Sequence, residues 1–590
     1  MKKILTILIL VFYGGGVFCQ GIEIKSSGYL QASGAAILLI KDGGLINNGT
    51  YTKGTEEVIF SGTAAKTISG SSNTTMNNLS VTNTGGITTQ LGLLTTNLLT
   101  IASGSKLTIA AAKAVTATGN TSLGSTQCLI IKSDDTGTAS FIDNGNIGGI
   151  GTALVERFLT PYVTVPDLKF HFISSPVGAA QLIAPGFIDF NSGLITDFYK
   201  WNEPSNQWIS YRLGNYGTEN YNVFNPTFAD TYFTAGKGYM VAYPADVTKN
   251  FVGVPITGTV NVTCSNTSSG GWNLIGNPFP SSVDWDYIRT NGLGNGMDNA
   301  LYYYDNAAQK YKYYIKLTGG FEGGTKDIPP MQGIMVHAKT SGTQTVSFTQ
   351  NSRSHAGLSN YWKDEPLTTN ILDLKVEGNN QTDFARVCFY EEATENFDGD
   401  FDAFKIFSYA ESASEIYSVT PDLTKLAINT LPLAILDGGS IPVNFKVGTA
   451  GNYTLSAEKL NSFALNTYII LEDNVTGALQ KLNDNPMYAF SASTLDAADR
   501  FVLHFKDATA IQEPEAQETI SAYYHNGSFY VSRCEGTTLV GIFNIQGQNL
   551  LNYQFEGGGL QSASLNLPMG VYFARLVNNG NMQTIKMIVR

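Results

Sequence analysis

Short alternations of apolar and polar residues run along the whole chain, and they predict strands rather than helices. Runs such as LINNGTYT, EEVIFSG and KLTIAA place leucine and β-branched residues between polar ones and lie next to Gly or Asn. An alternation with a period of two is typical of a strand with one buried face. Apolar positions three to four residues apart, which would indicate long helices, are nearly absent. The pattern therefore predicts an all-β protein.

Residues 21–150 are poor in charge and rich in Gly, Thr, Ser and Asn, with strands of four to seven residues that recur at irregular spacing. Small polar residues at tight corners, with β-branched residues between them, suit a β-solenoid-like repeat region, whose stacked rungs bury one continuous core. A flat sandwich of the same strands is the alternative.

Residues 151–355 contain an internal repeat, which predicts a duplicated, aromatic-rich β domain. FHFISSPV (Phe170–Val177) matches WNLIGNPF (Trp272–Phe279), and GYMVA (Gly238–Ala242) matches GIMVHA (Gly333–Ala338). Between them, YKWNEPSNQW and YYYDNAAQKY both carry two aromatic residues seven positions apart. We expect the two copies to pack as a pseudo-symmetric pair, because each alone would expose an apolar face.

Two further β regions follow. Eight alternating strands predict a β-sandwich over residues 368–506, and residues 507–518 are acidic and poor in apolar side chains, which predicts a linker. Residues 519–590 contain about seven short strands, the number typical of an immunoglobulin-like sandwich.

Three segments of residues 519–590 resemble the signatures of type A C-terminal sorting domains, which mark substrates of the type IX secretion system. GIFNIQGQNL resembles the first signature, LPMGVYFARL the second and the terminal KMIVR the third, in the expected order and spacing. Gln548 departs from the family, which usually has a basic residue there, and lysine is commoner at the last position. The candidate sorting residues are Gly547, Gly570, Tyr572, Lys586 and Arg590.

This resemblance implies contact with the outer-membrane secretion machinery, removal of the module by a sortase-like peptidase, and attachment to the cell surface or release. The other end of the chain agrees with export. Two lysines precede an apolar run, Ile4–Phe12, which predicts a signal peptide at residues 1–19 that is too short to span a membrane. We therefore expect an exported protein that acts at the cell surface or outside the cell.

Composition narrows the range of partners. The net charge is -12 and only 14% of the residues are charged, so nucleic acid is not an expected partner. Beyond Cys19, the four cysteines fall in four different predicted domains, which argues against disulfides within a domain and favours small buried side chains. The five histidines are scattered without the spacing of metal ligands.

One acidic segment is a weak calcium candidate. Asp398, Asp400 and Asp402 alternate in FDGDFDAF and would share one face of a strand, where oxygen ligands could hold a hard cation. An EF-hand would need Gly at Ala403 and Glu at Tyr409. The other interpretation is a solvated acidic loop. No other cofactor is predicted.

Aromatic density in the repeated hairpins suggests glycan binding. Trp201, Trp208, Tyr304 and Tyr311 are the candidates, because exposed Trp and Tyr rings stack on sugars. The other interpretation is that they form cross-strand pairs.

No catalytic constellation stands out: neither a G-x-S-x-G nucleophile elbow nor H-E-x-x-H occurs. Asp284 and Asp286 in VDWDY would lie on one side of a strand, where a paired-acid role has no further support. The expected function is non-catalytic adhesion or binding of a polysaccharide or a neighbouring cell surface. A glycan-active enzyme, either a polysaccharide lyase or a hydrolase, and a structural surface component are the alternatives.

Overall fold

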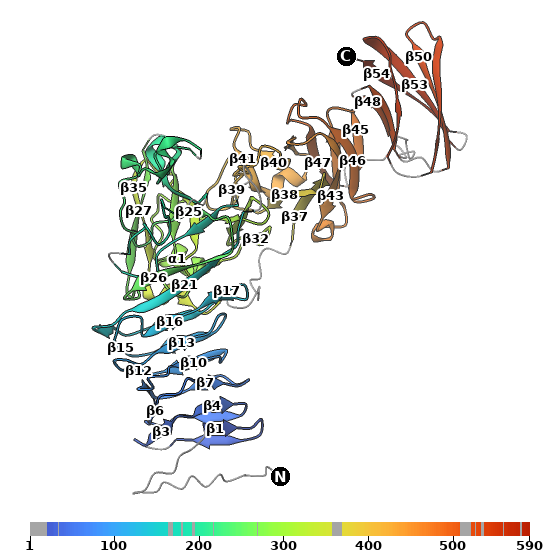
Figure 1. The fold of residues 1–590 in the computed structure, drawn as a ribbon. Coiled ribbons are helices and arrows are strands. Elements are labelled where there is room, and N and C mark those ends of the chain that lie inside the picture. The colour runs from blue at the N-terminus through green and yellow to red at the C-terminus, as the bar shows by residue number, and fades with distance from the viewer. Residues whose placement is uncertain are drawn as a thin grey trace, which may run out of the picture. The chain divides into compact units, whose positions relative to one another are not determined.

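The computed structural model describes residues 21–32, 35–162, 169–178, 181–191, 195–215, 217–267, 270–356, 369–507, 521–525, 527–532, 536–557, 560–578 and 581–589. The chain divides into two compact units, one up to Asp364 and one from Glu365 (Figure 1). Strands dominate both units, and the described residues contain one α-helix, α1 (Trp285–Asn291), which confirms the all-β prediction. Within those ranges, no helix has the length and apolar character needed to span a membrane.

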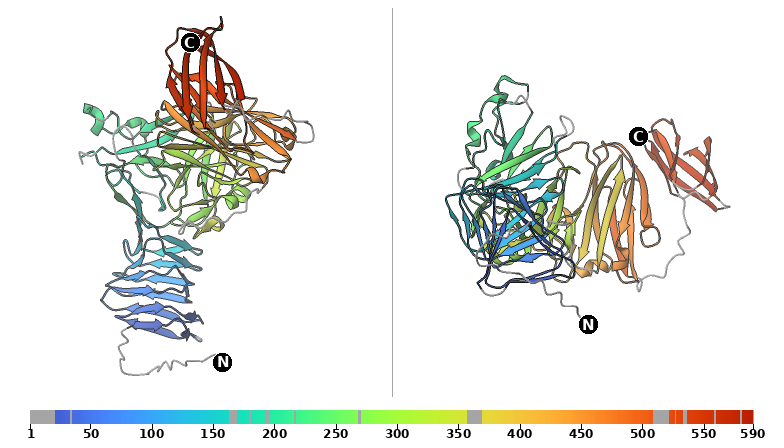
Figure 2. Two further views of the ribbon diagram at one scale, coloured as in Figure 1. Left: turned by 90° about the vertical axis from the view of Figure 1, so that its right-hand side faces the viewer. Right: turned by 60° about the horizontal axis from the view of Figure 1, so that its bottom comes forward.

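The first unit begins with a β-solenoid, as predicted. Parallel strands stack in three series along successive rungs (Figure 2). The first series is β1 (Gly21–Ile24), β4 (Gly44–Asn47), β7 (Lys66–Ser69), β10 (Ile87–Thr89), β13 (Leu107–Ile109), β16 (Leu129–Ile131) and β21 (Ala153–Leu159). The second is β3 (Ile37–Lys41), β6 (Glu57–Ser61), β9 (Asn78–Val81), β12 (Leu98–Ile101), β15 (Thr121–Leu123) and β20 (Ile147–Gly149). The third is β2 (Tyr29–Gln31) and β5 (Thr50–Thr52), then β8 (Thr74–Thr75), β11 (Leu93–Thr96), β14 (Ala114–Ala117) and β19 (Ser140–Asp143).

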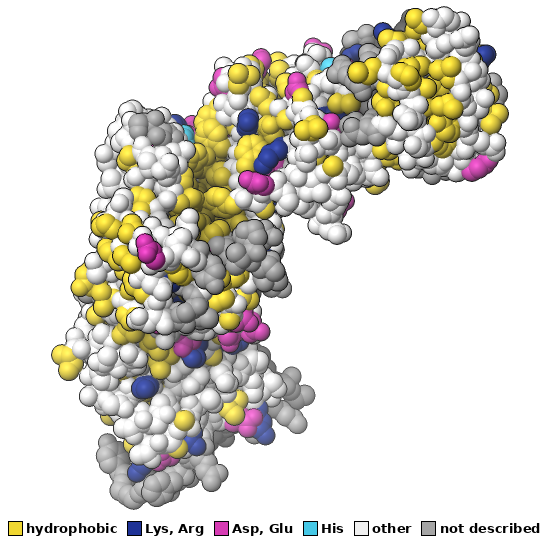
Figure 3. Space-filling view, turned by 45° about the horizontal axis from the view of Figure 1, so that its top comes forward, with side chains coloured by type: hydrophobic (Ala, Val, Ile, Leu, Met, Phe, Trp, Pro, Cys, Tyr) yellow, Lys and Arg dark blue, Asp and Glu magenta, His cyan; other side chains and the backbone are white. Residues whose placement is uncertain are grey.

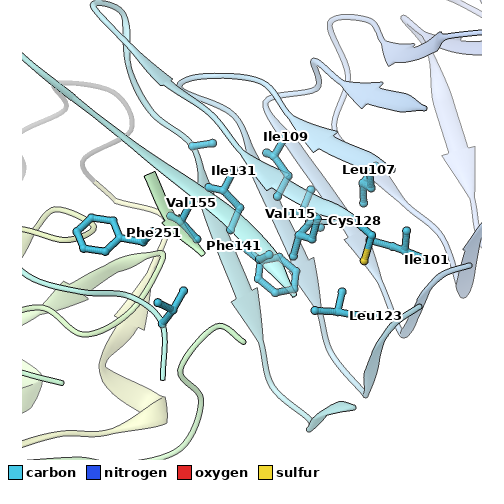
Figure 4. Packing of buried hydrophobic residues seen from close by; sticks show 14 of the residues in the cluster. Ile101, Leu107, Ile109, Val115, Leu123, Cys128, Ile131, Phe141, Val155 and Phe251 are labelled. Atoms are coloured by element: carbon cyan, nitrogen blue, oxygen red, sulfur yellow. The ribbon is translucent and has the colours of Figure 1, made fainter. Parts of the chain in front are cut away.

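Vertical columns of buried side chains hold the rungs together. The strand register stacks Ile109 on Ile131 and Ile131 on Val155, and all three are fully buried in the core shown in Figure 4. Each such side chain contributes about 1.5–3 kcal/mol by leaving water. A buried asparagine, Asn83, fixes one corner, because its amide donates to the carbonyls of Ser61 and Ala64. Apolar columns and polar corners together explain the composition of this region.

The duplicated unit has one strand order in both copies. In the first copy the order is β22 (His171–Ile173), β25 (Tyr239–Ala242), β23 (Asp197–Asn202) and β24 (Gln207–Ser210). In the second copy it is β28 (Trp272–Gly276), β34 (Gly333–His337), β30 (Leu301–Asp305), β31 (Lys310–Ile315) and β32 (Gly319–Phe321). Isolated bridges between Ile173 and Gln332 and between Lys237 and Ile275 join the copies.

The repeat is longer than the matching segments indicated. Each copy is flanked by an antiparallel pair of seven-residue strands: β21 with β26 (Val247–Gly253), and β27 (Val260–Asn266) with β35 (Gly342–Phe348). The short strands β29 (Ser282–Asp284), β33 (Asp327–Ile328) and β36 (Arg353–Ser354) form a separate sheet, and β17 (Ser133–Asp134) pairs with β18 (Gly137–Thr138). Because β21 also belongs to the solenoid, β26 extends the first solenoid sheet.

The second unit starts with an 11-stranded sheet rather than two separate sheets of a sandwich. Its order is β45 (Ala478–Lys481), β44 (Thr467–Asp473), β47 (Phe501–Asp507), β42 (Ser440–Lys446), β40 (Glu415–Val419), β41 (Lys425–Leu431), β38 (Gln381–Phe389), β37 (Ile371–Gly378), β43 (Gly451–Glu458) and β46 (Met487–Ala492), with β39 (Ala403–Phe404) beside β41. The sheet curls around one core, and Gln480 of the first strand donates to the carbonyl of Met487 in the last. The sheet is therefore nearly closed.

The C-terminal module, residues 521–589, packs two sheets around its own core, in agreement with the predicted sandwich. One sheet contains β48 (Ser521–His525), β49 (Ser528–Ser532) and β52 (Gln561–Ser564). The other contains β51 (Asn549–Glu556), β50 (Thr537–Asn544), β53 (Gly570–Asn578) and β54 (Asn581–Val589).

Several predictions concern residues outside the described ranges. These are the signal peptide at residues 1–19, the linker after Asp507, Cys534 and Arg590. The other three cysteines of the predicted mature chain, Cys128, Cys264 and Cys388, are free and buried, as expected for apolar core residues.

Candidate functional site

Two of the three segments that resemble sorting signatures meet at one end of the C-terminal module. The first ends β50 in a turn, where the Asn544 side chain accepts hydrogen bonds from the backbone N–H groups of Gln546 and Gln548 at 3.0 and 2.9 Å. Gly547 has a φ of 77°, a conformation that favours glycine. In the second segment, the Tyr572 hydroxyl donates to the Pro568 carbonyl at 2.9 Å, which fixes the loop before β53.

A groove of about 680 Å³ lies between this turn and this loop. Its apolar lining includes Ile545, Leu550, Leu551, Leu567 and Val571, together with Gly570 and Tyr572. Ile545 is 67% exposed. Figure 3 shows hydrophobic side chains gathered over the C-terminal module. The groove therefore offers a contiguous apolar surface to a partner. Single exposed leucines elsewhere on a protein surface do not form such a patch.

The third segment lies on β54 at the edge of the four-stranded sheet. Lys586 is exposed, whereas Met587 and Val589 are buried, so the expected alternation of faces is observed for these residues. Lys586 does not line the groove.

The four glycan candidates lie in two cross-strand pairs rather than on an open surface. Trp201 and Trp208 are edge to face with ring centroids 5.1 Å apart, and Tyr304 and Tyr311 repeat this arrangement at 5.3 Å. The two tryptophans are half-buried and the two tyrosines are buried. Cross-strand pairing was the alternative interpretation, and the geometry matches it.

The buried Phe172 joins the two pairs. Its ring centroid lies 5.7 Å from that of Trp208, 5.4 Å from that of Tyr304 and 6.2 Å from that of Tyr311. Together with Trp201, these residues form what we call the aromatic cluster, which seals the two copies of the duplicated unit against each other.

The calcium candidates lie in a loop before β39, not on one face of a strand, and that part of the prediction is wrong. The buried Asp402 accepts hydrogen bonds from the backbone N–H groups of Asp398 and Thr430, both at 2.7 Å. Asp398 accepts one from the N–H of Asp400, which is exposed. Among the described residues, no group of three or more His, Cys, Asp or Glu side chains is arranged to hold a metal ion.

The prediction of paired acids on a strand at Asp284 and Asp286 is also wrong. Strand β29 ends at Asp284, which is the N-cap of α1 and accepts from the N–H groups of Asp286 and Tyr287 at 2.8 and 3.2 Å. An aspartate just before a helix satisfies N–H groups that the first turn leaves free. Asp286 in turn accepts a hydrogen bond from the Tyr314 hydroxyl.

Sequence patterns missed a second site, which we call the polar pocket. It has a volume of about 470 Å³ and is lined by residues of β17, β18, β21, β22 and the β30–β31 hairpin. The acidic and basic side chains in its lining are Asp134, Asp135, Arg157 and His171, and the amides are Asn306 and Gln332. Phe172 and Tyr304 of the aromatic cluster, together with Phe158, form apolar wall.

One family model, described as a domain of unknown function (DUF8693), matches residues 51–505. The chain belongs to the DUF8693 family. The DUF8693 region includes most of the solenoid, the duplicated unit with its aromatic cluster and polar pocket, and nearly all of the 11-stranded sheet. It does not include the C-terminal module. No curated protein matches the chain.

Two histidines make the DUF8693 region sensitive to acid. Burial, together with the charge of Arg157, lowers the pKa of His171 to about 4, although a hydrogen bond to the Thr160 carbonyl opposes the shift. Burial and Arg353 likewise lower the pKa of His355 to about 4, and the His355 ring contacts the hydroxyls of Thr116 and Ser140. Both histidines are therefore neutral in the folded protein at pH 7.

We expect the first unit to lose stability between pH 6.5 and 4. An unfolded histidine titrates near 6.5, so over this range the unfolded chain binds protons that the folded chain rejects. Above pH 6.5 the two histidines do not reduce the free energy of unfolding. At pH 4 each of them lowers that free energy by at most about 3 kcal/mol. Urea denaturation followed by tryptophan fluorescence measures this, because all five tryptophans precede residue 365. A His171→Gln/His355→Gln double variant should show a flatter pH dependence, and an unchanged slope contradicts the assignment.

Proposed function

We propose that this protein is exported by a type IX secretion system, with residues 519–590 as its sorting domain, and that the exported part is a non-catalytic surface-binding protein. The observation that carries the first half is the groove. Residues of two signature segments, far enough apart in sequence to lie on different strands, line one exposed apolar surface.

The proposed occupant of the groove is the outer-membrane secretion machinery. Apolar side chains that are held by a fixed turn and a fixed loop form a pre-organised docking surface, which binds with little loss of conformational freedom. Lys586 adds an exposed positive charge outside the groove. A sortase-like peptidase would then cut the chain in residues 507–518.

The exported part suits binding to a polysaccharide or a neighbouring cell surface. A solenoid presents long, regular faces, and the duplicated unit adds a pocket with charged and amide side chains beside an apolar wall. The aromatic cluster supports this role indirectly, since it fixes one wall of the pocket rather than offering free ring faces.

Loss of export in a groove variant is the decisive result. In a bacterium that has a type IX secretion system, Ile545→Asp should leave the protein in the periplasm, because a charge in the groove opposes apolar docking. Met582→Asp is the matched control, since Met582 is also exposed (59%) but lies outside the groove. Cell fractionation measures both variants, and circular dichroism checks that each module is folded.

A second variant tests the assignment as a whole. A chain that lacks residues 586–590 should also remain in the periplasm. If that truncated chain reaches the surface, the sorting assignment is wrong. If the truncated chain is retained but Ile545→Asp is exported normally, the groove is not the docking surface.

A further inference from the structure

The polar pocket contains a cation, Arg157, that forms no ion pair with any residue the structure describes. Arg157 projects from β21, and its Nη2 donates to the Gln332 side-chain oxygen at 3.1 Å. Its Nε is buried and donates no hydrogen bond among the described residues. Burial alone lowers the pKa of Arg157 to about 10, so the guanidinium stays charged at pH 7. A buried charge without a partner is unfavourable, and a ligand anion would relieve that cost.

The duplication supplies an internal comparison. At the tip of the first hairpin, the Glu203 carboxylate accepts hydrogen bonds from the Thr267 N–H at 3.0 Å and from the Thr267 and Ser265 hydroxyls, both at 2.9 Å. The second copy therefore receives a carboxylate from the first. Only 5% of Glu203 is exposed, so this contact is closed to solvent.

The equivalent contact in the other direction lacks the carboxylate. The flanking strands pair in matching registers, Ala153 with Gly253 and Val260 with Phe348. This register makes Thr160 the counterpart of Thr267. Thr160 accepts a hydrogen bond from the side-chain amide of Asn306 at 2.7 Å, and Asn306 lies where the first hairpin has Glu203.

By the same register, the position equivalent to Arg157 in the other copy holds a neutral residue. This residue is Cys264, which is buried in an apolar core. At these equivalent positions one contact thus has the Glu203 carboxylate and the neutral Cys264, and the other has the Arg157 cation and the neutral Asn306 amide. The polar pocket therefore lacks a carboxylate at the position that Glu203 occupies in the other contact.

We propose that the polar pocket binds an acidic sugar unit, a uronic acid of a polysaccharide, and that Arg157 pairs with its carboxylate. This deepens the proposed function by naming a ligand class and a site, and it rests on that function only in assigning the exported part a binding role. An arginine fork matches a carboxylate in geometry as well as charge.

The rest of the lining suits a hydroxylated ring. The amides of Asn306 and Gln332 and the Thr136 hydroxyl can exchange hydrogen bonds with sugar hydroxyls, and the half-buried Phe158 offers apolar contact to the ring. A pocket of about 470 Å³ lies within the size range of small-molecule sites.

The two aspartates in the pocket lining favour a singly charged ligand. Asp134 and Asp135 are exposed, and the Asp134 carboxylate already accepts hydrogen bonds from the Thr136 N–H and hydroxyl at 2.9 and 2.6 Å. Solvent weakens their repulsion of an anion. A phosphate would bring about two negative charges against one cation and two carboxylates, so a carboxylate is the better match.

Isothermal titration calorimetry on the purified full chain tests the proposal, with oligogalacturonate as the acidic probe and a neutral galactose oligomer as its control. Binding of the acidic probe alone is expected. Arg157→Gln should weaken binding about 10- to 100-fold, the usual loss for a charge-assisted hydrogen bond. Lys106→Gln removes an equal charge from an exposed solenoid position outside the pocket and should change nothing.

The exposed Asp135 gives an independent arm that does not disturb packing. Asp135→Asn should strengthen binding of the acidic probe by roughly two- to threefold, because a repulsive charge is removed. This arm decides the matter if Arg157→Gln lowers the unfolding midpoint. Equal binding of the neutral oligomer, weaker binding by Asp135→Asn, or no binding of either oligogalacturonate or a glucuronate-containing oligosaccharide overturns the proposal. Because purified protein is used, failure here leaves the export proposal untouched.

Discussion

Replacing Asp473 by alanine is expected to lower the free energy of unfolding of the second unit by about 3–5 kcal/mol, the usual cost of removing one partner of a buried ion pair. Asp473 is fully buried and accepts hydrogen bonds from Arg500 Nε and Nη2 at 3.1 and 2.8 Å and from the Tyr488 hydroxyl at 2.8 Å. Without this carboxylate, the Arg500 cation would remain buried and unpaired.

The position of this network makes the effect specific to one part of the 11-stranded sheet. Asp473 ends β44, and Tyr488 lies on β46 at the far end of the strand order. Arg500 also donates to the carbonyl of Ser491 on β46 at 2.7 Å. The network therefore joins the two ends of the nearly closed sheet, and its loss should expose the amides of β46 first.

Calorimetric unfolding and hydrogen exchange measure this change, because the second unit contains no tryptophan. Asp484→Ala is the control. The Asp484 side chain is 69% exposed and pairs with Lys481 at 3.4 Å, so a change within about 0.5 kcal/mol is expected. A loss below about 1 kcal/mol for Asp473→Ala would mean that the network contributes little to closing the sheet.

Phe172→Ala is expected to destabilise the first unit by about 3–5 kcal/mol, the range for removing a buried phenylalanine. Phe172 is 1% exposed and its ring contacts Trp208, Tyr304 and Tyr311. The change would leave a cavity between the two copies of the duplicated unit, where side chains from both must move to fill it.

Urea denaturation with tryptophan fluorescence reports Phe172→Ala directly, because Trp208 lies in the aromatic cluster. Tyr232→Ala is the matched control, since Tyr232 is 47% exposed and lies outside the cluster, and it should change stability by no more than about 0.5 kcal/mol. If both variants unfold at the same urea concentration as the unaltered protein, the cluster does not hold the copies together.

The solenoid could be predicted because its signal is local. Each strand alternates along a few residues, and many corners carry Gly or Asn. The Asn83 side chain, for example, forms hydrogen bonds with nearby backbone groups. What local patterns do not contain is the register between rungs. The pairing of Ile87 with Leu107 joins residues whose strands look alike but whose spacing varies along the stack.

The duplication was detectable only where side chains are similar. The aromatic pairs Trp201–Trp208 and Tyr304–Tyr311 revealed it, and the structure places both pairs directly across their hairpins. The flanking strands β21 and β27 have dissimilar residues, ALVERFL and VNVTCSN, so their equivalence appears only in the strand pairing.

The predictions for two aspartates were wrong because their side chains form hydrogen bonds with backbone N–H groups. Asp284 and Asp402 were considered for chemistry with a ligand, yet both accept hydrogen bonds from nearby or adjacent N–H groups. An aspartate before a possible helix start, as in VDWDY, is a signal of capping that a strand interpretation overlooks. In the second unit, eight strands of sandwich-like length gave no indication that they would join into one sheet.

The polar pocket could not be predicted because its parts come from distant segments. Arg157, His171, Asn306 and Gln332 have no common spacing, and each alone is an ordinary polar residue in a strand or loop. These residues come together only when the two copies of the duplicated unit pack. Arg157 then indicates a binding site because no described carboxylate pairs with it, and this cannot be read from the sequence.

The antiparallel pairing of β26 with β21 has a consequence for self-association. A parallel stack ends in a row of unpaired backbone groups, which invites another chain to add a rung and can seed fibres. Here β21, the last strand of the first series, is already paired along its full length, from Ala153 to Leu159, by a strand of opposite direction. Fibre growth by addition of a further rung to this strand is thereby blocked within the molecule itself.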